Sequence, residues 1–140
     1  MKIYFAGSIR GGREKVEDYK KIIKILSEYG TVLTEHIADE TILSVGEKHI
    51  TDEEIYERDI AWLDESDIVI AEVTVTSLGV GYEIGYAEAK GKKILCLFHM
   101  IDGGATRTSA MVSGNKNLTM IMYTTFEELE IQLSKQMEVL

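Results

Sequence analysis

The sequence has 140 residues, of which 45% are hydrophobic, and a formal net charge of −9. This length suits one domain, residues 1–140, with a sizeable core. The negative charge disfavours nucleic-acid polymers and anionic membranes as partners, although backbone N–H groups in a loop can still hold a small anion. No apolar run reaches the ~20 residues that span a bilayer, and the N-terminal apolar segment is too short for a signal peptide. A single cysteine, Cys96, allows no internal disulfide and fits a cytoplasmic protein.

Short apolar runs alternate along the chain with segments of helical period. Gly30 and Gly91 stand where glycines close helices, and Thr51 with Glu54 has the spacing of a capping box. In chain order, we expect a strand over 3–6, a helix over 14–29, a strand over 31–34, a helix over 51–66, a strand over 67–73, a helix over 82–90, strands over 93–98 and 118–123, and a last helix opened by Thr125 and Glu128.

This alternation predicts an α/β fold, a three-layer sandwich around a five-stranded, mainly parallel sheet of the Rossmann or flavodoxin-like kind. The nearly unbroken apolar strands agree with a sheet that is covered on both faces. Sites in such sheets lie beyond the carboxyl ends of the strands. Segments 37–50 and 100–117 receive no assignment, and loops of that length are usually functional or mobile.

The loop after the first expected strand, residues 7–13, carries three glycines, a serine and two arginines ahead of a helix. Exposed N–H groups and the positive end of a helix suit a phosphate there. The loop has neither the P-loop lysine nor the glycine spacing of a dinucleotide site. A simple turn that needs glycine dihedral angles is the alternative interpretation.

The loop after the third expected strand is also rich in glycine, with Gly79, Gly81 and Gly85 close to Glu83. We expect Glu83 in the first turn of the following helix. A carboxylate there either interacts favourably with the helix dipole or stands at the active edge of the sheet beside a phosphate-sized loop. Both interpretations stay open from the residues alone.

Asp59 lies in the apolar stripe of the second expected helix, with Ile55 and Leu63 at helical spacing. An unpaired charge in such a stripe is costly, so a cation, hydrogen-bond donors or a raised pKa must accommodate it. A structural ion pair is the plain explanation. Two carboxylates directed at one cleft are also the apparatus of glycosidic cleavage.

Tyr4 and His36 are weaker candidates. Tyr4 lies within the first strand, where periodicity alone indicates a core aromatic. His36 follows the second strand at the same rim, where a histidine is more often a structural hydrogen bonder. The three histidines show no metal-ligand spacing, and with a single cysteine no zinc site is indicated.

Taken together, these segments resemble the 2′-deoxynucleoside 5′-phosphate N-hydrolases, a branch of the nucleoside 2-deoxyribosyltransferase superfamily. The likeness runs from residue 3 to about residue 112 and is weakest over 37–50 and 102–108. The motifs that carry it are residues 4–14 (YFAGSIRGGRE), 30–36 (GTVLTEH), Asp59 with Trp62–Leu63, 71–74 (AEVT), 77–83 (SLGVGYE), 94–98 (ILCLF) and 109–111 (SAM).

The resemblance implies hydrolysis of the N-glycosidic bond of 2′-deoxynucleoside 5′-monophosphates to a free base and 2-deoxyribose 5-phosphate. It also implies a homodimer with sites at the interface and a reaction that needs no metal or other cofactor. Glu83 matches the nucleophile, Asp59 the carboxyl group that assists protonation of the departing base, and Tyr4 a tyrosine that orients the nucleophile. The implied substrate-binding residues are Ser8, Ile9, Arg10, Gly11, His36, Ser77, Gly79 and, from the neighbouring subunit, Ser109.

Three other functions remain open at this stage. A nucleoside 2-deoxyribosyltransferase would pass the sugar to a second base rather than to water. A ribonucleotide N-glycosidase would differ only in how the site treats the 2′-hydroxyl group. A nucleotide sensor without activity would bind substrate but leave the position of Asp59 unexplained.

Overall fold

The computed structural model describes residues 1–9, 15–38 and 50–140. Within these ranges no helix is both long enough and apolar enough to cross a membrane. The strands are β1 (Lys2–Ala6), β2 (Thr31–Val32), β3 (Ile68–Glu72), β4 (Lys93–His99) and β5 (Thr119–Tyr123). The helices are α1 (Val16–Leu26), the short 3₁₀ helix η2 (Glu35–Ala38), α3 (Asp52–Glu65), α4 (Leu78–Ala89), α5 (Ala110–Ser113) and α6 (Phe126–Glu138).

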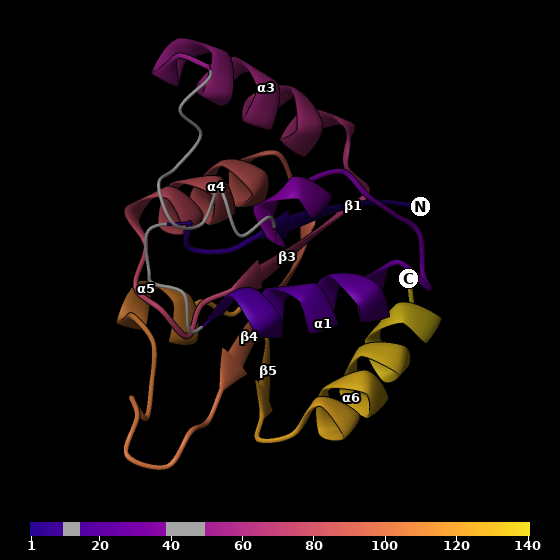
Figure 1. Ribbon diagram of the computed structural model, residues 1–140, viewed down its shortest axis with the longest axis vertical. Helices are drawn as coiled ribbons and strands as arrows, with labels where there is room; N and C mark the ends of the chain where they lie inside the picture. The colour runs from indigo at the N-terminus through magenta and orange to yellow at the C-terminus, as the bar shows by residue number, and fades with distance from the viewer. Residues whose placement is uncertain (10–14, 39–49) are drawn as a thin grey trace.

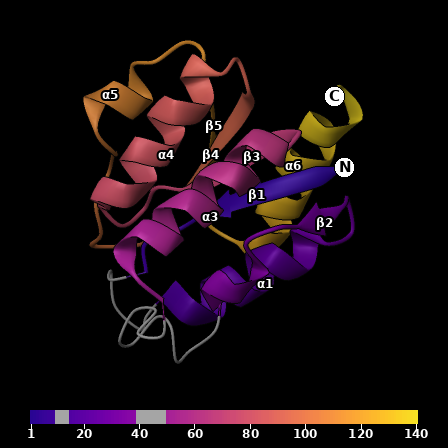
Figure 2. The same cartoon turned by 90° about the horizontal axis from the view of Figure 1, so that it is seen from above.

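The five strands form one sheet in the order β2-β1-β3-β4-β5, and each neighbouring pair is parallel. Helices α1 and α6 cover one face, while α3 and α4 cover the other (Figures 1 and 2). The strand order reverses between β1 and β3, so the connections that leave these two strands diverge and open a crevice there. The predicted three-layer, flavodoxin-like architecture is confirmed.

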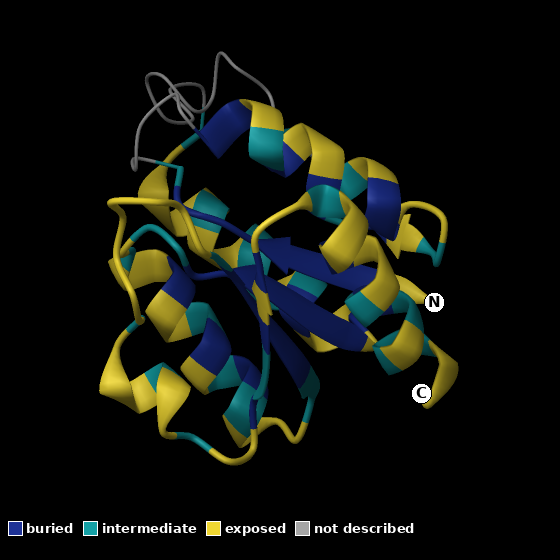
Figure 3. Ribbon diagram, turned by 90° about the horizontal axis from the view of Figure 1, so that it is seen from below, coloured by how far each residue is buried: buried dark blue, intermediate teal, exposed yellow. Residues whose placement is uncertain are grey.

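Two cores result from the alternation of side chains along each strand. On β1, Ile3 and Phe5 pack into the core beneath α1 and α6, whereas Tyr4 and Ala6 pack into the core beneath α3 and α4. The strands are buried almost throughout, and the outer faces of the helices are exposed (Figure 3). Tyr4 therefore faces the same layer as the two candidate carboxylates.

Helix α4 is longer than the sequence predicted. It begins at Leu78 rather than at residue 82, because the Ser77 hydroxyl accepts the backbone N–H of Val80 and caps the helix. Gly79 and Gly81 are poor helix formers and hid this first turn from the pattern. Glu83 consequently lies in the second turn, so the expectation of a first-turn carboxylate at the helix dipole was wrong.

Gly30 does not close α1, as the sequence pattern had predicted. The helix spans residues 16–26 instead of 14–29, Ser27 is its C-terminal cap, and Gly30 has no positive φ. A side chain at Gly30 would overlap the carbonyl oxygen of Met1, which accepts the N–H of Thr31. Glycine is required here because two backbone segments approach closely.

The other predicted helix boundaries agree with the structure. Gly91 has a φ of +70° directly after α4, which suits a glycine that closes a helix. The capping box of Thr51 and Glu54 is present, and Thr125 caps α6 by accepting the N–H of Glu128.

We predict that Gly30→Ala lowers the free energy of unfolding by about 2 kcal/mol, because the new methyl group forces the backbone of Met1 away from residue 30. Urea denaturation measures this change. Gly85→Ala is the matched control, since nothing lies within 4 Å of a Cβ at that helical position. Equal stability of the two variants would contradict the close-approach explanation.

Candidate functional site

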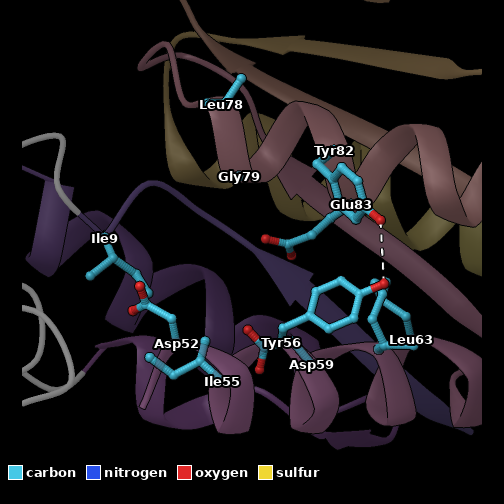
Figure 4. Close-up of a pocket in the computed structure, with 11 residues that line it drawn as sticks. Ile9, Asp52, Ile55, Tyr56, Asp59, Leu63, Leu78, Gly79, Tyr82 and Glu83 are labelled. Carbon is cyan, nitrogen blue, oxygen red and sulfur yellow. Dashed lines mark hydrogen bonds between the residues drawn. The ribbon is translucent and has the colours of Figure 1, made fainter. Parts of the chain in front are cut away.

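A pocket of about 480 Å³ opens between α3 and α4, at the carboxyl ends of β1 and β3. Its volume is within the range of small-molecule sites, and its lining is mostly apolar. Two carboxylates enter it from opposite sides, Asp59 from α3 and Glu83 from α4 (Figure 4). The other lining residues are Ile9, Asp52, Ile55, Tyr56, Ile60, Leu63, Leu78, Gly79 and Tyr82.

The surroundings of Glu83 shift the pKa of its carboxyl group. Burial raises the pKa of its carboxyl group to about 7, and the nearby charge of Asp59 adds to the increase. A hydrogen bond from the Tyr4 hydroxyl opposes the increase, because it stabilises the carboxylate. A carboxyl group that titrates near neutral pH is suited to proton transfer or to nucleophilic attack.

Tyr4 stands beneath the pocket on β1 and is almost completely buried. Burial raises its pKa far above the ordinary value, and the negative charges of Glu83 and Asp59 raise it further. The hydroxyl group therefore stays protonated and donates its hydrogen bond to Glu83. The structure brings together the three residues that the sequence proposed as catalytic.

Asp59 is paired with a cation. The Nε and Nη2 atoms of Arg58 lie 3.0 and 2.9 Å from its Oδ1 atom. The Arg58 guanidinium also lies over the ring of Trp62, 4.8 Å from the ring centre. Of the ways to accommodate an aspartate in an apolar stripe, the structure thus shows an ion pair within α3.

Two tyrosines at the pocket were missed by the sequence analysis. The hydroxyl groups of Tyr56 and Tyr82 lie 3.5 Å apart, so the side chains meet between α3 and α4 (Figure 4). Each tyrosine is about half exposed. Tyr56 could have been found, since it lies three residues before Asp59 and so shares its helix face. Tyr82 could not, because the start of α4 was misplaced.

A second pocket of about 590 Å³ adjoins the first, and Leu78 and Tyr82 line both. Ser77 and Ser109 of the same chain line this second pocket. Each of these serines caps a helix: Ser77 caps α4, and the Ser109 hydroxyl accepts the N–H of Met111 at the start of α5. The two predicted phosphate-contacting serines therefore lie at one pocket.

The remaining predicted residues divide into three groups. Ile9 and Gly79 line the pocket that holds Glu83. Ser8 is buried with its carbonyl accepting the Tyr19 hydroxyl at 3.2 Å, and the His36 ring lies 5.4 Å from that of Trp62. Neither of these two lines the described pockets. Arg10 and Gly11 lie outside the described residues.

The described parts of the chain contain no group of three His, Cys, Asp or Glu side chains that could hold a metal ion. The fold and the site together define a flavodoxin-like α/β protein with a carboxylate pair in an apolar pocket at the β1/β3 switch point. This combination is typical of a small-molecule site. The chain belongs to the nucleoside 2-deoxyribosyltransferase family, whose profile matches residues 3–122.

Relatives with similar sequences are named 5-hydroxymethyl-dUMP N-hydrolase. The protein from Danio rerio is 46% identical over 132 residues, which cover 94% of this chain and 91% of the relative. The Homo sapiens protein is 45% identical over 131 residues, which cover 93% and 74%. The solved structure of the CMP N-glycosidase BcmB from Clostridium botulinum shares the fold, with a TM-score of 0.65, 21% identity and coverage of 96% and 99%.

We predict that Glu83→Gln stabilises the folded protein by about 2 kcal/mol at pH 8. The raised pKa means that the folded state resists ionisation, so stability is lost between about pH 4.5, where the unfolded carboxyl group ionises, and about pH 7. Glutamine does not ionise and avoids this loss. Urea denaturation at pH 4 and pH 8 measures the difference, and an equal effect at both pH values would contradict the assigned burial.

Proposed function

We propose that this chain hydrolyses the N-glycosidic bond of 2′-deoxynucleoside 5′-monophosphates to a free base and 2-deoxyribose 5-phosphate. The observation that carries the proposal is a pair of carboxylates, Glu83 and Asp59, that face each other across an apolar pocket. The Tyr4 hydroxyl donates a hydrogen bond to Glu83. The substrate class comes from the names of relatives that are 45–46% identical over most of this chain.

In the first step, the Glu83 carboxylate attacks the anomeric carbon of the sugar. The C–N bond breaks, its electron pair stays on the base, and the base takes up a proton from the carboxyl group of Asp59. Such cleavage passes through an oxocarbenium-like transition state, which a nearby carboxylate stabilises. The Tyr4 hydroxyl holds Glu83 in the orientation for attack.

In the second step, water replaces Glu83 at the anomeric carbon. Asp59, now ionised, accepts a proton from this water, and the departure of Glu83 restores the starting state of both groups. Carboxyl groups and water carry both steps. Ser77 at the adjoining pocket, together with Ser109 of the neighbouring subunit, would hold the 5′-phosphate away from the reacting atoms, so that binding energy positions the sugar.

We predict that purified protein releases free base from deoxynucleoside 5′-monophosphates, including 5-hydroxymethyl-dUMP, and does so more slowly from the matching nucleosides. Glu83→Gln lowers kcat/KM by at least about a thousandfold, and Asp59→Asn lowers it by about a hundredfold or more. Chromatographic separation of base and sugar phosphate measures both. The matched control is Glu57→Gln, which neutralises an exposed carboxylate on α3.

Each competing function predicts a different result in the same assay. Exchange of one base for another from unphosphorylated nucleosides would indicate a transferase. Equal turnover of ribonucleotides would indicate a less selective N-glycosidase. Nucleotide binding without turnover by the folded wild-type protein would indicate a sensor and would exclude the proposed reaction.

We further propose that the chain acts as a homodimer joined across the face formed by the second pocket. Leu78 and Met111 are 93% and 83% exposed there, and Tyr82 is about half exposed beside them. Apolar side chains gathered on one face commonly mark an interface. A partner that covers this face would bring a second Ser109 near the first site.

We expect light scattering to give twice the monomer mass for the wild-type protein and the monomer mass for Met111→Glu, because the new charge would be buried against a partner. Ile131→Glu, on the exposed face of α6, is the matched control and should leave the mass unchanged. A wild-type monomer at micromolar concentration would contradict the dimer.

A further inference from the structure

We propose that Arg58 is a positioning residue for the reaction, which holds the Asp59 carboxyl group in a fixed plane and sets the pH range over which it exchanges its proton. This inference rests on the proposed function, because it concerns the carboxyl group that we expect to protonate the base. Neither the family resemblance nor the sequence pattern assigned Arg58 a role.

The contact between Arg58 and Asp59 is unusual for neighbours in a helix, because consecutive side chains point in different directions. Two donors of one guanidinium, Nε at 3.0 Å and Nη2 at 2.9 Å, converge on the same oxygen, Oδ1. Two donors on one oxygen restrict rotation of the carboxyl group more than one donor would. The carboxyl group is therefore held before substrate arrives.

Trp62 explains why the guanidinium reaches this position. Arg58 and Trp62 are four residues apart, on the same face of α3, and the guanidinium lies 4.8 Å from the centre of the indole ring. The same indole ring also contacts η2, because the His36 ring lies 5.4 Å from it. An arginine that is packed on an aromatic ring loses little further entropy when it binds a carboxylate.

The guanidinium also gives the two carboxyl groups of the pocket different electrostatic environments. It directly contacts Asp59, whereas Glu83 is governed by burial, which raises its pKa to about 7. The positive charge of Arg58 extends to Tyr4, where it partly opposes the dominant effect of burial on the pKa. Two carboxyl groups in unlike environments take unlike roles in a reaction.

The positive charge of Arg58 beside Asp59 stabilises the carboxylate that is left after the proton has passed to the nucleobase. Arg58 thus affects both the pH range over which Asp59 exchanges its proton and the position of the carboxyl group that carries it. Among the described residues, the other ionisable groups around the pair are Asp52 and Tyr56 from α3, Tyr82 from α4, Tyr4 from β1 and His36 from η2 beside Trp62.

The experiment compares the pH dependence of kcat/KM for wild type, Arg58→Gln and Arg58→Lys. Active enzyme needs Glu83 ionised and Asp59 protonated, so we expect a bell-shaped profile. Loss of the cation in Arg58→Gln makes Asp59 retain its proton to higher pH, so the limb that Asp59 sets moves upward by about half a unit while the limb that Glu83 sets stays in place. The maximum falls about tenfold through loss of orientation.

Arg58→Lys separates charge from geometry. Lysine keeps the charge but lacks the planar pair of donors, so we expect unmoved limbs with a maximum lowered about tenfold. Lys90→Gln, which removes a cation at the end of α4 that pairs with Asp64 at 3.6 Å, is the matched control and should leave the whole profile unchanged. Far-UV circular dichroism checks that each variant folds.

A role confined to stability would lower the Arg58→Gln profile without moving its limbs, and that result would overturn the proposal. A second readout is independent of activity: carboxyl ¹³C NMR follows the titration of Asp59, assigned with Asp59→Asn. We expect its midpoint to rise in Arg58→Gln and to stay in place in Arg58→Lys. An inactive wild-type protein would refute the proposed function, and the NMR titration would then decide on the Arg58 contact by itself.

Discussion

Burial of a carboxyl group at the β1/β3 switch point is the constraint on which the site depends. Glu83 enters an apolar pocket, and its environment resists ionisation so strongly that its pKa rises to about 7. Tyr4 partly stabilises the buried carboxylate by donating a hydrogen bond to it. The tyrosine faces Glu83 because alternate residues of β1 point to opposite faces of the sheet. The parallel strand order brings β1 and α4 together, so the fold itself creates the pair.

The sequence predicted the sheet, the order of strands and helices, and the three residues that meet at the pocket. These features depend on short-range patterns, namely apolar periodicity and capping spacings, or on a combined motif such as residues 77–83. Asp59 was informative because it is a charged residue within the otherwise apolar stripe of its helix. Such exceptions indicate candidate sites, because a buried charge is costly unless a partner compensates it, as Arg58 does here.

The failures share a different physical origin, because they depend on contacts between distant segments or on backbone geometry. Gly30 fits a helix-closing pattern but is explained by Met1, about thirty positions earlier in the chain. The start of α4 was hidden by glycines inside a helix that Ser77 caps. Arg58 was overlooked although Trp62 follows it by four residues, because spacing alone does not show that a guanidinium packed on that ring also reaches the neighbouring Asp59.

Leu78 and Tyr82 line both of the adjoining pockets. A second copy of the chain seated on the outer pocket would therefore also fix a wall of the pocket that holds Glu83, so assembly and the proposed turnover would be thermodynamically linked. Linkage of this kind follows mass action. Specific activity would then depend on enzyme concentration, declining on dilution as protomers separate, and substrate would in turn oppose that separation by binding the assembled form.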